Sequence, residues 1–301
     1  MAARIPIVAI IGPTGIGKTR LSVKVAQALD GEVVSVDSIQ VYRDCPIMAA
    51  QVTVEEMENV PHHLVNYLGV AEEPVDFIAT AVQSIKSIHK RGYVPVICGG
   101  STSLIEPLLF DPFIKAQNLL VLVLNSDVTT VRNLCDERIN QMLEEGLLDE
   151  VKHLYELEKQ HGRHNDERRS GAWKSIGYPE LRPWCDAKSI EEAEGLLRDG
   201  TQLMKQNTLN YVITQFDLLW SRLMPAMSAT KRPFYVFDVI SRETFSENVE
   251  SPAVTLCKDW LLTAGRESPL GASLNVDYAA DAVRAREAAE VTSALGYMNG
   301  L

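Results

Sequence analysis

The sequence predicts an α/β protein: a doubly wound parallel sheet of about five strands with a mainly helical C-terminal part. Two observations lead to this prediction. Short, continuous apolar runs, typical of strands that are buried on both faces, alternate with segments of helical period. A glycine-rich loop follows the first of these runs and opens the first helix. Ligands of such sheets bind beyond the carboxyl ends of the strands, so functional residues are expected there.

Five apolar runs predict the strands. They are rich in Val, Ile and Leu, and they cover residues 5–11, 32–36, 94–98, 119–125 and 234–239. The segments between them predict the helices. Residues 18–29 follow the glycine-rich loop, and the amphipathic segments 76–91 and 127–145 each stop at a glycine. Ser189 and Glu192 have the spacing of a capping box, which predicts a long helix toward residue 224.

The chain is divided by composition near residue 240. Residues 1–240 are predicted to form one phosphate-loop domain, in which a helical segment at about 127–224 covers the substrates. Residues 241–301 are acidic and rich in Ala, Ser and Glu, with a helix expected near 278–295. We expect them to form a helical, partly mobile tail without catalytic residues.

Composition restricts the class of protein. Of the 301 residues, 46% are apolar and 23% are charged, which is ordinary for a soluble globular protein. No apolar run is long enough to span a membrane, and no secretory signal precedes the first strand. The five scattered cysteines lack zinc-site spacing, so free thiols in the cytoplasm are expected. The net charge of −11 disfavours a stable nucleic-acid partner, and we expect a monomer.

The glycine-rich loop is the strongest motif of the chain. It matches Gly-x-x-x-x-Gly-Lys-Thr and consists of Gly12, Pro13, Thr14, Gly15, Ile16, Gly17, Lys18 and Thr19. In this strand–loop–helix context, its backbone N–H groups and the helix N-terminus bind phosphate. Lys18 adds a positive charge, and the hydroxyl of Thr19 is a ligand for Mg²⁺. The motif predicts that a phosphate chain binds here, without defining which one.

Polar residues follow the next two predicted strands. Asp37 comes directly after the second strand, where its carboxylate can accept a proton near the bound phosphate. Gly99 and Gly100 follow the third strand, and Ser101 and Thr102 add hydroxyl groups at the same sheet edge. The adjacent pair His62–His63 lies in a loop, where a structural role is favoured over a catalytic one.

These motifs, in this order, resemble the isopentenyltransferase family over roughly residues 5 to 220. The matching segments are residues 12–19, 36–43, 60–64, 99–103, 137–146 and 174–181. The resemblance implies transfer of a dimethylallyl group from its diphosphate to N6 of adenine. It implies that the phosphate loop and Arg138 bind the donor diphosphate, with Lys18 and Thr14 acting at the leaving group. It further implies that Asp37 is the base. The acceptor nucleotide would contact Asp37, Ser38, Gln40, Ser101, Thr102 and Lys174.

Within the family, the sequence is more similar to adenylate dimethylallyltransferases, which form cytokinins, than to the tRNA-modifying branch. The tRNA enzymes usually insert a helical segment after the Gly-Gly motif, but here Phe113 runs almost directly into the next strand. Gln51, Trp173 and Thr214 stand where relatives often carry a lysine or an arginine. The choice between AMP, ADP and ATP therefore stays open.

Two other classes of protein share part of the pattern. A small-molecule kinase also combines a phosphate loop with an Asp after the second strand, although Gly99 replaces the acidic residue expected after the third strand. A nucleotide-binding regulatory module would use its tail for partners. ATP turnover with and without dimethylallyl diphosphate separates these alternatives from prenyl transfer.

Overall fold

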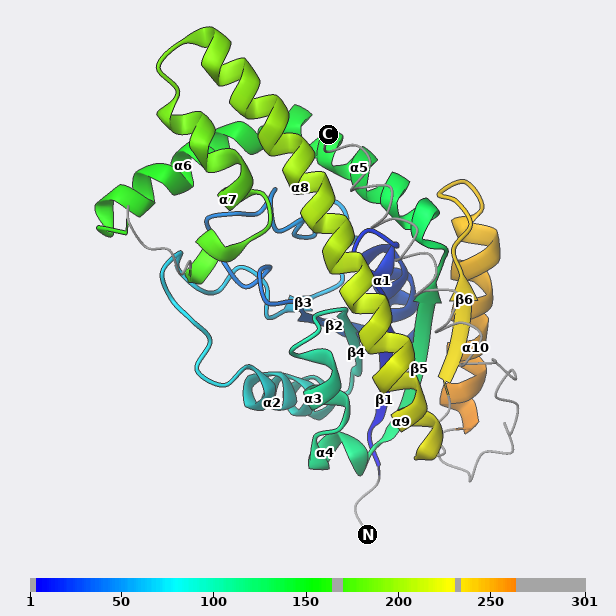
Figure 1. Ribbon diagram of the computed structural model, residues 1–301. Coiled ribbons are helices and arrows are strands. Elements are labelled where there is room, and N and C mark those ends of the chain that lie inside the picture. The colour runs from blue at the N-terminus through cyan, green and yellow to red at the C-terminus, as the bar shows by residue number, and fades with distance from the viewer. Residues whose placement is uncertain (1–3, 164–169, 231–233, 264–301) are drawn as a thin grey trace.

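The computed structural model describes residues 4–163, 170–230 and 234–263, and it contains a six-stranded parallel sheet (Figure 1). The strand order is β3-β2-β4-β1-β5-β6. The strands are β1 (Pro6–Ile11), β2 (Gly31–Val36), β3 (His62–His63), β4 (Val94–Gly99), β5 (Asn118–Asn125) and β6 (Phe234–Asp238). The five predicted strands are confirmed. The sixth strand, β3, pairs with Val33 and Val34. It is only two residues long, which is too short for a hydrophobic pattern that would predict it from the sequence.

Helices connect the strands and continue beyond them. They are α1 (Lys18–Leu29), α2 (Phe77–Lys90), α3 (Ile105–Leu109), α4 (Pro112–Lys115), α5 (Val128–Glu144), α6 (Leu147–Gln160), α7 (Tyr178–Leu181), α8 (Ile190–Leu218), α9 (Met224–Ala229) and α10 (Ser251–Thr263). The cap predicted at Ser189 is present, since its side chain accepts a backbone N–H at the start of α8. The side chains of Asp76 and Asp127 cap α2 and α5 in the same way. None of the helices in the described ranges combines the length and the apolar character that crossing a bilayer requires.

The helices cover both faces of the sheet. The chain moves outward from β1 to β2 through α1 and back from β3 to β4 through α2, and right-handed connections in opposite directions place these helices on opposite faces. In Figure 1, α8 passes in front of the sheet, and α10 lies behind β6. The segments α5, α6, α7 and the first half of α8 extend beyond the carboxyl ends of the strands. The predicted doubly wound fold is thereby confirmed.

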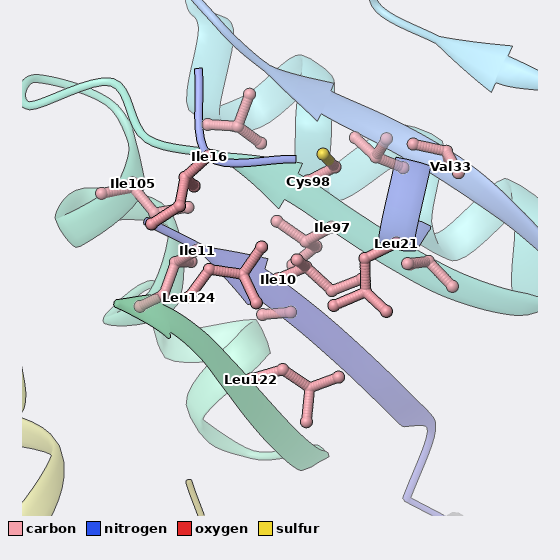
Figure 2. Close-up of a cluster of buried hydrophobic side chains, with 14 of the residues drawn as sticks. Ile10, Ile11, Ile16, Leu21, Val33, Ile97, Cys98, Ile105, Leu122 and Leu124 are labelled. Carbon is pink, nitrogen blue, oxygen red and sulfur yellow. The ribbon is translucent and has the colours of Figure 1, made fainter. Parts of the chain in front are cut away.

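The core lies between the sheet and these helices (Figure 2). Ile10 and Leu122 are fully buried on neighbouring strands, and Leu21 from α1 packs beside them. Burying each such side chain contributes roughly 1.5–3 kcal/mol. Ile16, from the middle of the phosphate loop, is also buried and attaches the loop to this core. The loop therefore has a rigid support.

The long helical stretch expected from Ser189 toward residue 224 is present and continues to Ala229. A π-helical turn, Leu219–Leu223, separates α8 from α9. After β6, residues 246–263 form a second π-helical turn and α10, which packs against α1. Part of the predicted tail therefore contacts the helix that follows the phosphate loop. Residues 264–301, including the helix expected near 278–295, lie outside the described residues.

Candidate active site

The phosphate loop connects β1 to α1 and lies against the Gly-Gly segment after β4. A Cβ atom on Gly100 would lie 2.2 Å from the carbonyl oxygen of Gly12, so only glycine permits this approach. Gly17 has a φ of 97° and caps α1, and a Cβ atom there would meet the ring of Phe245 at 2.8 Å. The loop is thus enclosed by the Gly-Gly segment on one side and by the segment after β6 on the other.

Lys18 and Thr19 occupy the first turn of α1, beside a cavity of about 340 Å³. Lys18 Nζ donates to the Pro13 carbonyl at 2.6 Å, which holds the ammonium group over the loop. Burial lowers the pKa of Lys18, while Cys98 and the Asp37 carboxylate act in the opposite direction. Thr19 borders the same cavity. This arrangement suits a phosphate chain.

Arg138, from α5, reaches the same cavity from the helical side. Its Nη2 atom donates to the carbonyl of Ala50 at 3.1 Å, and burial lowers the pKa of its guanidinium. The contact with Ala50 holds Arg138 in place, and both Arg138 and Asp37 line the two neighbouring cavities. A second phosphate-binding cation is therefore available besides Lys18.

A second cavity, of about 440 Å³, adjoins the first. Its polar wall includes Ser38, Ser101, Thr102 and Tyr211. Its apolar wall is formed mainly by methionine and isoleucine side chains, namely Met48, Ile139, Met142, Ile176 and Met204. A flat apolar ring system with polar edges matches such a lining.

Thr14, Asp37 and Arg138 line both cavities and mark the place where they meet. Asp37 follows β2, and its Oδ1 atom accepts the backbone N–H groups of Ile39 at 2.8 Å and Gln40 at 3.2 Å. These hydrogen bonds fix the carboxylate in one orientation. Oδ2 has no hydrogen-bond partner in the described part of the chain. A carboxylate held in this way can accept a proton from a group at the junction.

Most of the predicted site residues gather around these cavities, with two differences. Gln40 was expected at the acceptor but lies along the phosphate-loop cavity, because Ser35 and the Ala50 carbonyl hold its amide. Gly12 and Pro13 form the buried base of the loop and do not line either cavity. Ser38, Ser101, Thr102 and Lys174 line the second cavity as expected.

The ammonium group of Lys174, beside the second cavity, is paired with a carboxylate. Its Nζ donates to Glu73 Oε2 at 2.7 Å, and Glu73 Oε1 accepts the N–H of Gly171 at 2.7 Å. Burial tends to raise the pKa of Glu73, but the hydrogen bonds from Lys174 and Gly171 outweigh it, and this pKa is lowered. Glu73 was not among the predicted site residues, because nothing in the sequence indicates that the two segments meet.

Gln215, on α8, was also missed as a functional residue. Its Oε1 atom accepts the N–H of Thr14 at 2.9 Å, and its Nε2 donates to the Gly100 carbonyl at 2.7 Å. The side chain is buried and joins the phosphate loop to the Gly-Gly segment. The sequence did contain one signal for this role: a polar glutamine at a position of the helix where the apolar pattern predicts burial.

The histidine pair lies outside the site. His63 Nε2 pairs with Glu32 at 2.5 Å, and His62 Nδ1 contacts the Val60 carbonyl at 2.9 Å. Neither histidine lines the two cavities. The favoured structural role agrees with this placement, since both residues form the edge strand β3.

The three positions that lack a cation have other contacts in this fold. Gln51 Nε2 donates to the carbonyls of Gln40 and Tyr42, and Trp173 is buried, with Nε1 donating to Leu154. Thr214 is exposed on α8 and bonds back to the carbonyl of Asn210. These side chains contribute packing and backbone hydrogen bonds without adding charge to the site.

Comparison with known proteins assigns the chain to a family. The IPP transferase family model matches residues 40–117 and 110–222. A bifunctional cytokinin biosynthesis protein of Fusarium pseudograminearum is 36% identical over 84% of this chain, which spans about half (52%) of that relative. Adenylate isopentenyltransferase 5 of Arabidopsis thaliana is 32% identical over 67% of this chain and 62% of its own length. A tRNA dimethylallyltransferase of Streptococcus uberis is 30% identical over 72% of this chain and 90% of its own.

Solved structures agree on the fold. A eukaryotic dimethylallyltransferase acting on tRNA superimposes with a TM-score of 0.73 at 24% identity, over 86% of this chain and 80% of that one. The tRNA isopentenylpyrophosphate transferase of Bacillus halodurans gives 0.64 at 25% identity, over 84% and 97%. These structures have a P-loop NTPase-like architecture, as this chain does. The chain belongs to the IPP transferase family, whose members are prenyltransferases.

Proposed function

We propose that this chain transfers a dimethylallyl group from dimethylallyl diphosphate to N6 of a free adenine nucleotide, as in cytokinin biosynthesis. The observation that carries the proposal is the pair of adjoining cavities that share Thr14, Asp37 and Arg138. One cavity has the phosphate loop and cations for a diphosphate, and the other has apolar walls with polar edges for an adenine. The reacting atoms would meet at the shared residues.

The donor diphosphate would lie on the N–H groups of the phosphate loop, with Lys18 and Arg138 beside it. These groups stabilise the negative charge that develops as the bond between C1 and oxygen breaks. The hydroxyl of Thr19 suits Mg²⁺, because this ion prefers oxygen ligands and is usually held together with substrate phosphates. When bound, Mg²⁺ supplies further positive charge against the leaving diphosphate.

Asp37 would act on the acceptor. The exocyclic amine of adenine is a weak nucleophile because its lone pair is delocalised into the ring. Oδ2 of Asp37 would accept a hydrogen bond from this amine and orient it toward C1 of the donor. As the bond between N6 and C1 forms, the bond between C1 and the diphosphate oxygen breaks, and one amine proton moves to Asp37. Thr14 lines this junction and would contact the leaving oxygen.

A free nucleotide is favoured over tRNA as the acceptor for two reasons. Between β4 and β5 the chain contains only the short helices α3 and α4, which leaves no helical subdomain to hold an RNA fold. The net charge of −11 gives little of the counterion-release affinity on which nucleic-acid binding depends. tRNA remains the second candidate, because the two solved structures compared above are of enzymes that modify tRNA.

One competition experiment tests the proposal. The purified protein is incubated with dimethylallyl diphosphate, Mg²⁺, tRNA and an equimolar mixture of AMP, ADP and ATP, at equal total adenine concentrations. Mass spectrometry is expected to find prenylated free nucleotide, with one diphosphate released for each product. Lys18→Ala serves as the impaired control, since it removes the cation at the leaving group. Preferential labelling of tRNA would reassign the acceptor, whereas ADP with a phosphorylated product would indicate a kinase.

A further inference from the structure

Arg242 lies in the segment after β6, in the part of the chain where the sequence indicates no functional residue. The structure brings it to the wall of the 340 Å³ cavity, which the phosphate loop also lines. The same cavity is lined by Lys18 and Arg138, which come from α1 and α5. A third, distant segment therefore adds a cation to the proposed donor site.

The guanidinium of Arg242 is only loosely held by the protein. Its Nε atom lies 3.7 Å from Glu137 Oε2, and its Nη2 lies 3.5 Å from the Leu134 carbonyl, at the outer limit for a hydrogen bond. Arg20 borders the same cavity and forms an ion pair with Glu250 through two hydrogen bonds, at 2.7 and 2.9 Å. The charge of Arg242 is therefore less compensated by the protein than that of Arg20, and its guanidinium has N–H donors for a ligand.

The charged side chains around this cavity favour the binding of an anion. Four cations line it, namely Lys18, Arg20, Arg138 and Arg242, against the two carboxylates of Asp37 and Glu56. The cations also act on one another. Burial lowers the pKa of Arg138, and the nearby charge of Arg242 lowers it further. In a chain with a net charge of −11, such a positive cluster is stabilised when a polyvalent anion binds between its members.

The segment that carries Arg242 is fixed at both ends. Before it, the Val239 N–H donates to the Asn125 carbonyl at 2.7 Å, which continues the pairing of β6 with β5. After it, Phe245 is buried with its ring against Gly17 of the phosphate loop. The guanidinium of Arg20 covers the other part of this ring, 5.1 Å from its centroid. Arg242 therefore holds a defined position relative to the loop.

We propose that Arg242 binds the diphosphate of the prenyl donor, so that the segment after β6 completes the donor site. This assignment rests on the proposed function, and the ligand class is an organic diphosphate. A guanidinium forms charge-assisted hydrogen bonds with phosphate oxygens, often two at once.

The test is diphosphate binding, measured by calorimetry with inorganic diphosphate and Mg²⁺ and without any turnover. We expect Arg242→Gln to weaken the affinity about tenfold or more, as for the loss of a hydrogen bond to a charged group. Binding of AMP should stay within about twofold of the wild type. Arg198→Gln is the matched control, because this exposed arginine contacts only the adjacent Asp199 among the described residues.

Unchanged diphosphate affinity in Arg242→Gln would overturn the assignment, and so would an equal loss in Arg198→Gln, which would indicate a net-charge effect. Should Arg242→Gln fail to fold, Arg242→Lys tests the same point. It keeps the charge but loses the guanidinium fork, so we expect weaker binding, and wild-type affinity would overturn the proposal. Diphosphate binding that depends on Arg242, without prenylated nucleotide among the products, would uphold this assignment and contradict the proposed function.

Discussion

The side-chain oxygen of Gln215 accepts the backbone N–H of Thr14 at 2.9 Å, and thereby ties α8 to the middle of the phosphate loop. The same side chain donates to the carbonyl of Gly100 at 2.7 Å. One buried amide therefore fixes the loop, the Gly-Gly segment and the covering helix relative to one another. Thr14 lies at the junction of the two cavities, so the position of this amide bears directly on the proposed reaction.

Gln215→Ala is expected to impair both stability and turnover. The substitution leaves the Thr14 N–H and the Gly100 carbonyl without their partner, which costs about 1–3 kcal/mol for each buried group left unpaired. We expect kcat to fall at least about tenfold, since misplaced reacting groups lose rate steeply. Chemical denaturation and steady-state kinetics measure the two effects. Gln206→Ala is the control, because among the described residues Gln206 on the same helix bonds only to the exposed Asn210.

Gly100→Ala is expected to displace the phosphate loop. The added Cβ would lie 2.2 Å from the Gly12 carbonyl oxygen, and backbone atoms must move to relieve this contact. Diphosphate affinity should therefore fall about tenfold or more, with a lowered midpoint of thermal unfolding. Gly195→Ala is the matched control, since a Cβ there has no neighbour closer than 4.0 Å. Because Gly195 lies inside α8, that variant should be stabilised by up to about 1 kcal/mol. Wild-type diphosphate affinity in Gly100→Ala would contradict the proposed contact.

Local sequence signals were sufficient for most of the fold. The run Ile7–Ile11 is buried along its whole length, so its strand and the loop after it were predictable from apolar continuity. The cap at Ser189 was equally clear, because a capping side chain acts on the residues next to it. The edge strand His62–His63 was not predictable, since two residues carry no period and the pairing depends on β2.

The residues of the candidate site were likewise predictable only where a local sequence signal marks them. The phosphate loop and Asp37 could be placed from sequence because each follows directly after a predicted strand. Gln215, Glu73 and Arg242 could not, because each reaches its position through tertiary contacts with segments far away in the chain. Arg242 shows this most clearly: it comes after the last strand, and contacts of Val239 with Asn125 and of Phe245 with Gly17 bring its segment to the loop.

Asp37→Asn is expected to reduce kcat by on the order of a hundredfold or more, because an amide cannot take the proton of the amine. The Asn side chain keeps an oxygen that can accept the N–H groups of Ile39 and Gln40, so the turn should be retained. Diphosphate affinity should consequently change little. Single-turnover kinetics with the donor and AMP measure the chemical step. Near-normal kcat in this variant would remove Asp37 from the role of base.

Lys174 borders the 440 Å³ cavity that we propose for the acceptor, but Glu73 neutralises its charge at 2.7 Å. The ion pair thus limits the attraction of this cavity for additional acceptor phosphates. Glu73 is in turn anchored by the Gly171 N–H and by the hydroxyl of Tyr42 at 3.3 Å. A variant that removes only the negative charge of Glu73 tests whether the pair sets the preference among AMP, ADP and ATP.

Glu73→Gln retains an oxygen for the Gly171 N–H but leaves the Lys174 ammonium without its counterion. The released cation attracts ATP more than AMP, so we expect the ratio of kcat/KM for ATP to that for AMP to rise roughly fivefold, in line with a partly exposed ion pair. Glu72→Gln removes the same charge one residue earlier, where the side chain accepts the Gly69 N–H, and should leave the ratio unchanged. Raising the salt concentration should shrink the gain, because screening weakens exposed charges. An unaltered ratio in Glu73→Gln at low salt would show that Lys174 does not face the acceptor phosphates.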